Sequence, residues 1–290
     1  MYDFVGKTKI WFTFSAILII LSVGALLFNA FVHGRALNFG QDFTGGTMIN
    51  LRFPNKISVD DVRLGLTKFK LENSVIQKAG DTDIFIRTEP LEPEIRKQIV
   101  DGFNEKYGGN VELLETDTIG PMIGKELASQ AIWALVISSI GIIIYVSFRF
   151  EFSYALAALI ALYHDAIIVT GLTALFWRNV ETPFVAAIMT IMGYSINDTI
   201  VIFDRIRENS KKYAGKKMKF AEIINISVAE TMARSINTVL TVVITTLAVL
   251  IFGGATLRDF MLTLLIGFIF GAYSSIFIAS PLVNMWRPKK

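Results

Sequence analysis

The chain has 290 residues, of which 53% are hydrophobic and 18% charged, and its formal net charge is +3. It contains no cysteine, which excludes disulfide bonds and thiolate metal sites. Its apolar residues come in long blocks, whereas a soluble protein spaces them with the period of its helices and strands. The sequence therefore predicts an integral membrane protein, and we expect no nucleic-acid partner.

The first apolar block, residues 10–32, follows a short N-terminal segment, residues 1–9. The block carries no charge, and about 20 apolar residues in a helix are enough to cross the hydrocarbon core. It lacks the A-x-A-like cleavage site of a secretory signal peptide. We therefore expect it to form a retained transmembrane helix.

Residues 33–127 are polar and predict a small α+β domain outside the membrane. One helix is expected after Ser58, with Asp61 completing a capping box, and a second is expected to start at Pro93. β-rich runs surround these helices, which gives the order β-α-β-β-α-β of a ferredoxin-like unit. No motif pairs a nucleophile with a base, and the histidine of this segment, His33, lies at the membrane edge. We expect docking or binding here rather than catalysis.

Five more apolar blocks predict the remaining spans, for six in all. We place these five at residues 128–148, 152–177, 183–203, 234–256 and 259–286. The fold class is thus a bundle of six transmembrane helices, with the α+β domain inserted between the first and the second.

Lysine and arginine in the short loops predict the orientation, because cytoplasmic loops carry an excess of both. They gather in residues 1–9, in a basic loop at 204–233 and in the C-terminal segment 287–290, which share one side if the spans alternate. Both termini are expected in the cytoplasm, and the domain at 33–127 outside. We place the chain in the cytoplasmic (inner) membrane.

Asp198 is a carboxylate deep within the fourth predicted span, about 9 Å of helix away from the charged end that starts at Asp204. A charge near the bilayer centre costs about 2.5–3.5 kcal/mol on insertion scales, and such residues usually mark a pathway or a relay. Aspartate is too short to reach the interface from that depth. The alternative, a purely structural ion pair, stays open.

Arg234 opens the fifth predicted span, and a polar row follows it along the helix. The row consists of Asn237, Thr238, Thr241 and Thr245. Lipid does not favour four polar groups on one helix face, whereas bundle interiors accept them. We expect this row to face Asp198 and Arg234 to pair with the carboxylate, with Asn197, Thr238 and Thr241 in support. The alternative for Arg234 alone is a membrane-interface anchor.

His164 and Asp165 form a second intramembrane candidate, near the middle of the third span. The helical neighbours of Asp165 are apolar, so any further partner must come from another helix. A functional site and a buried hydrogen bond that fixes packing are equally compatible with this pattern.

A buried aspartate next to an arginine has the chemistry of a proton carrier. One elementary charge that crosses 100 mV releases about 2.3 kcal/mol. No G-x-x-x-x-G-K-[ST] motif is present, so we expect an ion gradient rather than a nucleotide to supply energy. We expect no cofactor, no metal and no hydrolytic activity; the gradient is taken as protons, with sodium as the alternative.

Four segments resemble motifs of the SecF family of protein-export membrane proteins. They are GYSINDTIVIFDRIREN at 193–209, LNFGQDFTGGT at 37–47, NISVAETMARSINTVLT at 225–241 and the pair His164-Asp165. The likeness extends over the whole chain. It implies that Asp198 and Arg234 take part in proton conduction, in a twelve-span assembly with SecD similar to the RND superfamily.

The resemblance also implies the partners. Besides SecD, they are the SecYEG channel, the SecA motor, YajC, YidC and an unfolded preprotein on the outer face. The function implied is use of the proton-motive force to assist late preprotein translocation. Two alternatives stay open: a small-molecule exporter subunit of the RND type, and a non-transporting scaffold of the translocon.

Overall fold

The computed structural model describes residues 2–72, 74–254 and 257–286, which divide into two compact units. One unit, residues 39–133, is built around a β-sheet, and the other, residues 1–38 and 134–290, is helical. The expected C-terminal segment 287–290 and the last two residues of the expected span 234–256 lie outside the described residues.

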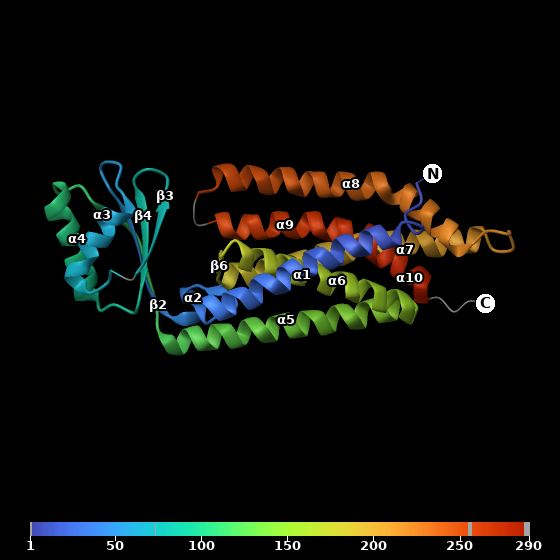
Figure 1. The fold of residues 1–290 in the computed structure, drawn as a ribbon, viewed down its shortest axis with the longest axis horizontal. Coiled ribbons are helices and arrows are strands. Elements are labelled where there is room, and N and C mark those ends of the chain that lie inside the picture. Colours follow the sequence, from blue (N-terminus) through green and yellow to red (C-terminus); the bar gives the residue numbers. More distant parts are fainter. Residues whose placement is uncertain (1, 73, 255–256, 287–290) are drawn as a thin grey trace. The chain divides into compact units, whose positions relative to one another are not determined.

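The helical unit holds long apolar helices that run side by side, and α5 belongs to it from residue 134 on (Figure 1). Their bounds are α1 Thr8–His33, α5 Pro121–Arg149, α6 Phe152–Leu175, α7 Thr182–Lys212, α8 Phe220–Phe252 and α9 Arg258–Ser274, the last continuing through a π-helical turn at Ser275–Ala279 into α10 Ser280–Trp286. Over the described residues, six helices are long and apolar enough to cross a membrane. The chain is a multi-pass membrane protein.

Three of the six spans are inner helices and three are outer ones. About half of the residues in α6, α7 and the span formed by α9 and α10 are buried within the chain, whereas few residues of α1, α5 and α8 are. Close contacts hold the inner helices together, because Gly267 and Gly271 of α9 lie directly against Ile191 and Ser195 of α7. The outer helices present their apolar side chains to lipid or to another subunit.

The helices at one end extend beyond the expected spans. The segment 204–233 is expected as a loop, but α7 continues to Lys212, α8 begins at Phe220, and only 213–219 connect them. Polar contacts explain the extension: the Arg205 guanidinium lies 2.6 Å from the Glu230 carboxylate of α8. A helix need not end where the hydrocarbon ends if its polar turns find partners. α5 likewise begins at residue 121, within the segment assigned to the outer domain.

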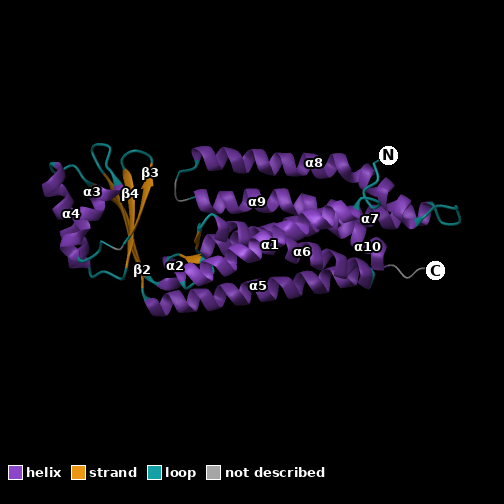
Figure 2. Cartoon of the chain, viewed as in Figure 1, coloured by secondary structure: helices purple, strands orange, loops and turns teal. Residues whose placement is uncertain are grey.

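The other unit contains a four-stranded antiparallel sheet, two longer helices and one helix of four residues (Figure 2). Its elements are α2 Gln41–Thr44, β2 Gly46–Arg52, α3 Val59–Leu66, β3 Val75–Ala79, β4 Asp83–Thr88, α4 Pro93–Tyr107 and β5 Glu112–Ile119; β1 Asn38–Phe39 lies at the boundary, and β6 Asn179–Val180 belongs to the helical unit. The sheet order is β3-β4-β2-β5.

Local signals determine both longer helices of this unit. The Ser58 hydroxyl accepts a hydrogen bond from the Asp61 amide, which confirms the expected cap of α3. Pro93 opens α4 as expected, and Gly108 ends it with a φ of 82°. Both helices bury their apolar faces against one side of the sheet. That core contains Ile49, Leu51, Phe53, Ile84 and Ile86 from the strands and their ends, and Val62, Leu66, Ile99 and Phe103 from the helices.

Candidate functional site

Asp198 is buried in the helical unit, with 7% of its surface exposed. α7 places it against α8, where the Ser235 hydroxyl donates a hydrogen bond of 2.7 Å to its Oδ1. Its other oxygen, Oδ2, is buried and has no hydrogen-bond partner among the described residues. One half of this carboxylate is therefore satisfied, and the other half is available to a proton or a water molecule.

Arg234 precedes Ser235 on α8, and its side chain is exposed. The described residues form no ion pair between its guanidinium and Asp198 within 4.0 Å, although the two groups are near enough to interact through their charges. The expected direct pair is therefore absent, and Ser235 is the group that contacts the carboxylate. We refer to Asp198, Ser235 and Arg234 as the Asp198 site.

The expected supporting residues do not join the Asp198 site. Asn197 is exposed on α7, and Thr238 and Thr241 are exposed on α8. The two threonine hydroxyls donate to carbonyl groups of their own helix. Ser235 was not expected from the sequence. It belongs to a second polar row of α8, formed by Thr231, Ser235 and Thr246, and all three of these residues are buried.

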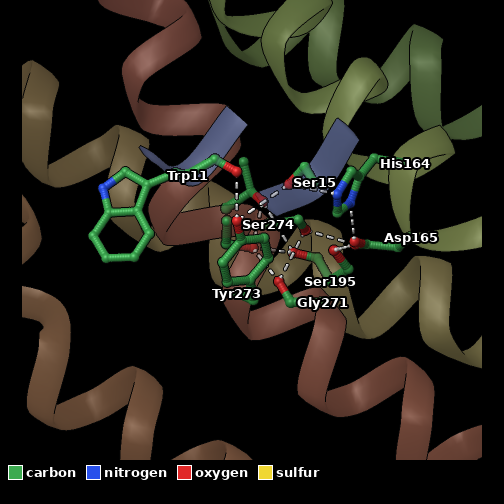
Figure 3. Close-up of polar contacts among 10 residues, drawn as sticks. Trp11, Ser15, His164, Asp165, Ser195, Gly271, Tyr273 and Ser274 are labelled. Carbon is green, nitrogen blue, oxygen red and sulfur yellow. Dashed lines mark hydrogen bonds and ion pairs between the residues drawn. The ribbon is translucent and has the colours of Figure 1, made fainter. Parts of the chain in front are cut away.

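Asp165 lies at the centre of a second polar group, which Figure 3 shows. Its side chain is 1% exposed, and its Oδ2 accepts hydrogen bonds of 2.7 Å from the hydroxyls of Ser195 and Ser274. Its Oδ1 lies 3.0 Å from Nδ1 of His164, whose Nε2 lies 3.0 Å from the Ser15 hydroxyl. We call these five residues the Asp165 cluster.

The Asp165 cluster joins four helices. Ser15 comes from α1, His164 and Asp165 from α6, Ser195 from α7 and Ser274 from α9 (Figure 3). The expectation that Asp165 needs partners from other helices agrees with the contacts on α7 and α9. None of the three serines was singled out from the sequence.

Small residues allow the four helices to approach closely enough for these contacts. A Cβ on Gly171 of α6 would overlap the backbone of Ser22 in α1, and a Cβ on Gly271 would lie 3.1 Å from Cβ of Ser195. Serine and glycine at helix interfaces let backbones come together in a membrane. The same property places short hydroxyl side chains within reach of a short carboxylate.

No group of three or more histidine, aspartate or glutamate side chains suited to a metal ion occurs in the described part of the chain. The arrangement consists of two buried carboxylates in one helical unit, one enclosed by donors and one with a free oxygen. It is typical of the class of membrane proteins that carry ionisable groups on a pathway inside their bundle.

Comparison with known proteins identifies the family within that class. Residues 99–289 match the family model described as "Protein export membrane protein SecD/SecF, C-terminal". The chain belongs to the SecD/SecF family of protein-export membrane proteins.

Individual relatives agree with this assignment. The protein translocase subunit SecF of Sebaldella termitidis is 42% identical, with 97% of this chain and 91% of that protein aligned. The protein translocase subunit SecDF of Bacillus subtilis is 37% identical over the full chain. The crystal structure of SecDF from Thermus thermophilus, a translocon-associated membrane protein, superposes on 99% of this chain with a TM-score of 0.88 and 34% identity.

The two SecDF proteins are much longer than this chain. It aligns with 38% of the Bacillus subtilis protein and with 39% of the Thermus thermophilus structure. This chain therefore corresponds to one part of those SecDF chains.

Proposed function

We propose that this chain acts as the SecF subunit of a Sec protein translocase and uses the proton-motive force to assist late preprotein translocation. The family and the names of the relatives support the translocase role. The single observation that carries the coupling is Asp198, a buried carboxylate with one oxygen free of hydrogen bonds.

In this proposal Asp198 takes up and releases the proton. While ionised, the carboxylate accepts the hydrogen bond from Ser235 and interacts with the nearby charge of Arg234. Protonation at Oδ2 removes that charge, and the attraction of α8 for α7 weakens. α8 has few buried residues, and in this proposal it is the helix that responds.

A second membrane subunit follows from the exposed polar row of α8. Asn237, Thr238, Thr241 and Thr245 are exposed within a span that lipid is expected to surround. The three threonine hydroxyls donate to carbonyl groups of their own helix, but lipid does not compensate the exposed amide of Asn237, whereas a second helical bundle does. We propose SecD as that subunit, consistent with the fused SecDF relatives. We also propose SecYEG, SecA, YajC and YidC as members of the same assembly.

The sheet unit is proposed to lie on the outer side, where it meets the unfolded preprotein. The order β3-β4-β2-β5 with two helices on one face supports a ferredoxin-like assignment of this unit. We further propose the cytoplasmic membrane as its location, with both termini in the cytoplasm and no hydrolytic site of its own.

The test is export into vesicles that contain the full chain, SecD, SecYEG and SecA, measured with and without a proton gradient. Asp198→Asn is expected to remove the gradient-dependent part of export, at least 10-fold, while co-purification with SecD is unchanged. Asn197→Ala is the matched control, because Asn197 is the neighbouring residue but exposed.

A scaffold role predicts a different result. The doubly neutral variant Asp198→Asn with Arg234→Gln would then export normally, since no charge would need to change. Normal gradient-dependent export by that variant, or by Asp198→Asn alone, would contradict the proposed coupling.

A further inference from the structure

The hydrogen bonds of the Asp165 cluster determine where its protons lie. The Tyr273 hydroxyl has one proton and lies 2.9 Å from the carbonyl oxygen of Trp11, which only accepts. The Tyr273 proton is therefore committed to Trp11. The Ser15 hydroxyl lies 3.2 Å from the same tyrosine oxygen, so Ser15 must donate in that contact.

The same assignment of protons extends to His164. Since the Ser15 proton points to Tyr273, the 3.0 Å contact between Ser15 and Nε2 of His164 needs a proton on Nε2. The 3.0 Å contact between Nδ1 of His164 and Oδ1 of Asp165 then needs another proton, because two lone pairs would repel each other. That proton belongs to His164 or to Asp165, and in both cases the pair is neutral overall.

The other oxygen of Asp165 is not the one that carries a proton. Its Oδ2 lies 2.7 Å from the hydroxyls of both Ser195 and Ser274. The Ser274 hydroxyl also lies 3.1 Å from the carbonyl oxygen of Gly271, but the shorter contact, to the carboxylate, takes its proton. The shared proton thus lies between Nδ1 and Oδ1. Among the described residues in contact with the cluster, α1 contributes Ser15, α7 contributes Ser195, and α9 contributes Ser274 and Tyr273. Tyr273 is the other titratable group in that shell.

Loss of the shared proton would leave one uncompensated charge at a place where His164 is 5% and Asp165 1% exposed. A buried charge without a counter-charge is strongly unfavourable. The cluster therefore retains its proton. It also holds α7 through Ser195, three residues before Asp198 on the same helix.

We propose that His164 and Asp165 are a proton-holding positioning pair, which keeps its proton while it holds α7, and so Asp198, in place. The positioning part rests on the proposed function of Asp198; the protonation part does not. This separates the two buried carboxylates by role: Asp165 retains a proton and Asp198 exchanges one.

Nitrogen-15 NMR of the full chain in lipid bilayers tests the protonation part. The chain has two histidines, so His33→Gln leaves His164 as the one labelled imidazole. Nε2 is expected to carry a proton, as its contact with Ser15 requires. A signal from unprotonated Nε2 would overturn the assignment.

Carbodiimide labelling of Asp198, located by mass spectrometry, tests the positioning part without any export assay. Ser195→Ala with Ser274→Ala is expected to change the labelling rate at least 3-fold. Ser139→Ala is the matched control, because its hydroxyl donates within its own helix, to the Leu135 carbonyl. Equal labelling of the double variant, the control and the unaltered chain would overturn the positioning role.

Asp165→Asn distinguishes a retained proton from a moving one. The asparagine amide donates to Nδ1 of His164, and its oxygen still accepts from both serines, so the neutral pattern is kept. Gradient-dependent export is expected to stay within about 2-fold of normal, with the same pH profile. Its loss, to the level of Asp198→Asn, would show that the proton of Asp165 moves and would overturn the proposal. If the gradient had no effect on export even in the unaltered chain, the proposed function of Asp198 would fail. The NMR and labelling results would still decide whether His164 and Asp165 are a proton-holding positioning pair.

Discussion

The two buried carboxylates of the helical unit differ in how completely they are satisfied. Asp165 accepts two serine hydrogen bonds and shares a contact with His164, so neither oxygen is free. Asp198 accepts one bond from Ser235 and leaves Oδ2 without a partner. A full set of partners gives a rigid helix junction, whereas a vacant oxygen gives a group that can change state.

The helices around the two carboxylates also differ in how many of their residues are buried. Asp165 lies among α1, α6, α7 and α9, three of which are tightly packed. Asp198 lies between inner helix α7 and outer helix α8, few of whose residues are buried. The more completely satisfied carboxylate is thus the one in the more buried part of the bundle.

The largest effect is expected when the two carboxylates are removed in turn. Asp165→Leu leaves the Ser195 hydroxyl without an acceptor and Nδ1 of His164 without its partner, which should cost about 3–5 kcal/mol, as for a broken buried pair. Asp198→Leu removes one acceptor and should cost about 1 kcal/mol. Thermal unfolding of the purified chain in detergent measures both. Equal destabilisation would remove the contrast between the sites.

The next effect concerns the approach of α1 to α6, on which the Ser15–His164 contact depends. Gly171→Ala forces a methyl group against the Ser22 backbone and should cost about 1–3 kcal/mol, as for overpacking. Gly193→Ala on α7 is the control, because nothing lies within 4 Å of its added Cβ. A Gly171 variant as stable as the control would show that the helices adjust freely.

Ser235→Ala sharpens the Asp198 half of the comparison. It removes the remaining hydrogen bond of the carboxylate, and the loss should be about 1 kcal/mol in unfolding free energy. Thr238→Val should have a smaller effect, since that exposed hydroxyl donates to its own helix. Greater destabilisation by the Thr238 variant would place the important contact elsewhere.

A third carboxylate, Asp83 of the sheet unit, provides a reference for the two buried carboxylates of the helical unit. Both of its oxygens lie 2.8 Å from the Arg52 guanidinium, and this hydrogen bonding lowers the pKa of Asp83 below its ordinary value. The pKa of Asp83 is lower in the folded protein than in the unfolded chain. The ion pair with Arg52 therefore stabilises the fold at pH values above the pKa of Asp83 in the unfolded chain. This stabilisation is lost as the pH falls through the pKa of Asp83 in the folded protein. Since solvent surrounds the Arg52 guanidinium and screens the pair, this contribution should be the smallest of those compared here.

Hydrogen exchange of β4 amides in the full chain measures this contribution. After correction for the intrinsic pH dependence, protection in the unaltered chain should fall between pH 5 and pH 2.5. Asp83→Asn should show less protection at pH 5 and no such fall. The same fall in both proteins would assign the pH dependence to another group.

Much of the fold is predictable from the sequence because the signals are local. A continuous apolar block defines a span by its own length, and Ser58, Pro93 and Gly108 act on the helix ends next to them. The ends of α7 and α8 were not predictable in this way. Whether a polar stretch continues a helix depends on contacts such as Arg205 with Glu230, which lie 25 residues apart in the chain.

Only some residues of the candidate site were predictable from the sequence. Asp165 and Asp198 are evident from the sequence, because a charge inside an apolar block is costly wherever it points. Their partners Ser15, Ser195, Ser235 and Ser274 are not evident, since serine is common in bundle interiors and only the rotation of each helix decides which one faces a carboxylate. The direct Arg234–Asp198 contact was expected from helix period alone, and the observed rotation turns Ser235 inward instead.

The extension of α7 beyond the apolar region has a mechanical consequence. Asp198 and Arg205 are seven residues apart on one helix, nearly two turns and about 10 Å, and both contact α8, through Ser235 and Glu230. Loss of the first contact leaves the second, reinforced by the 2.7 Å hydrogen bond that Asn209 donates to Glu230. The two helices would then remain joined near their polar ends, even with the contact at the depth of Asp198 lost.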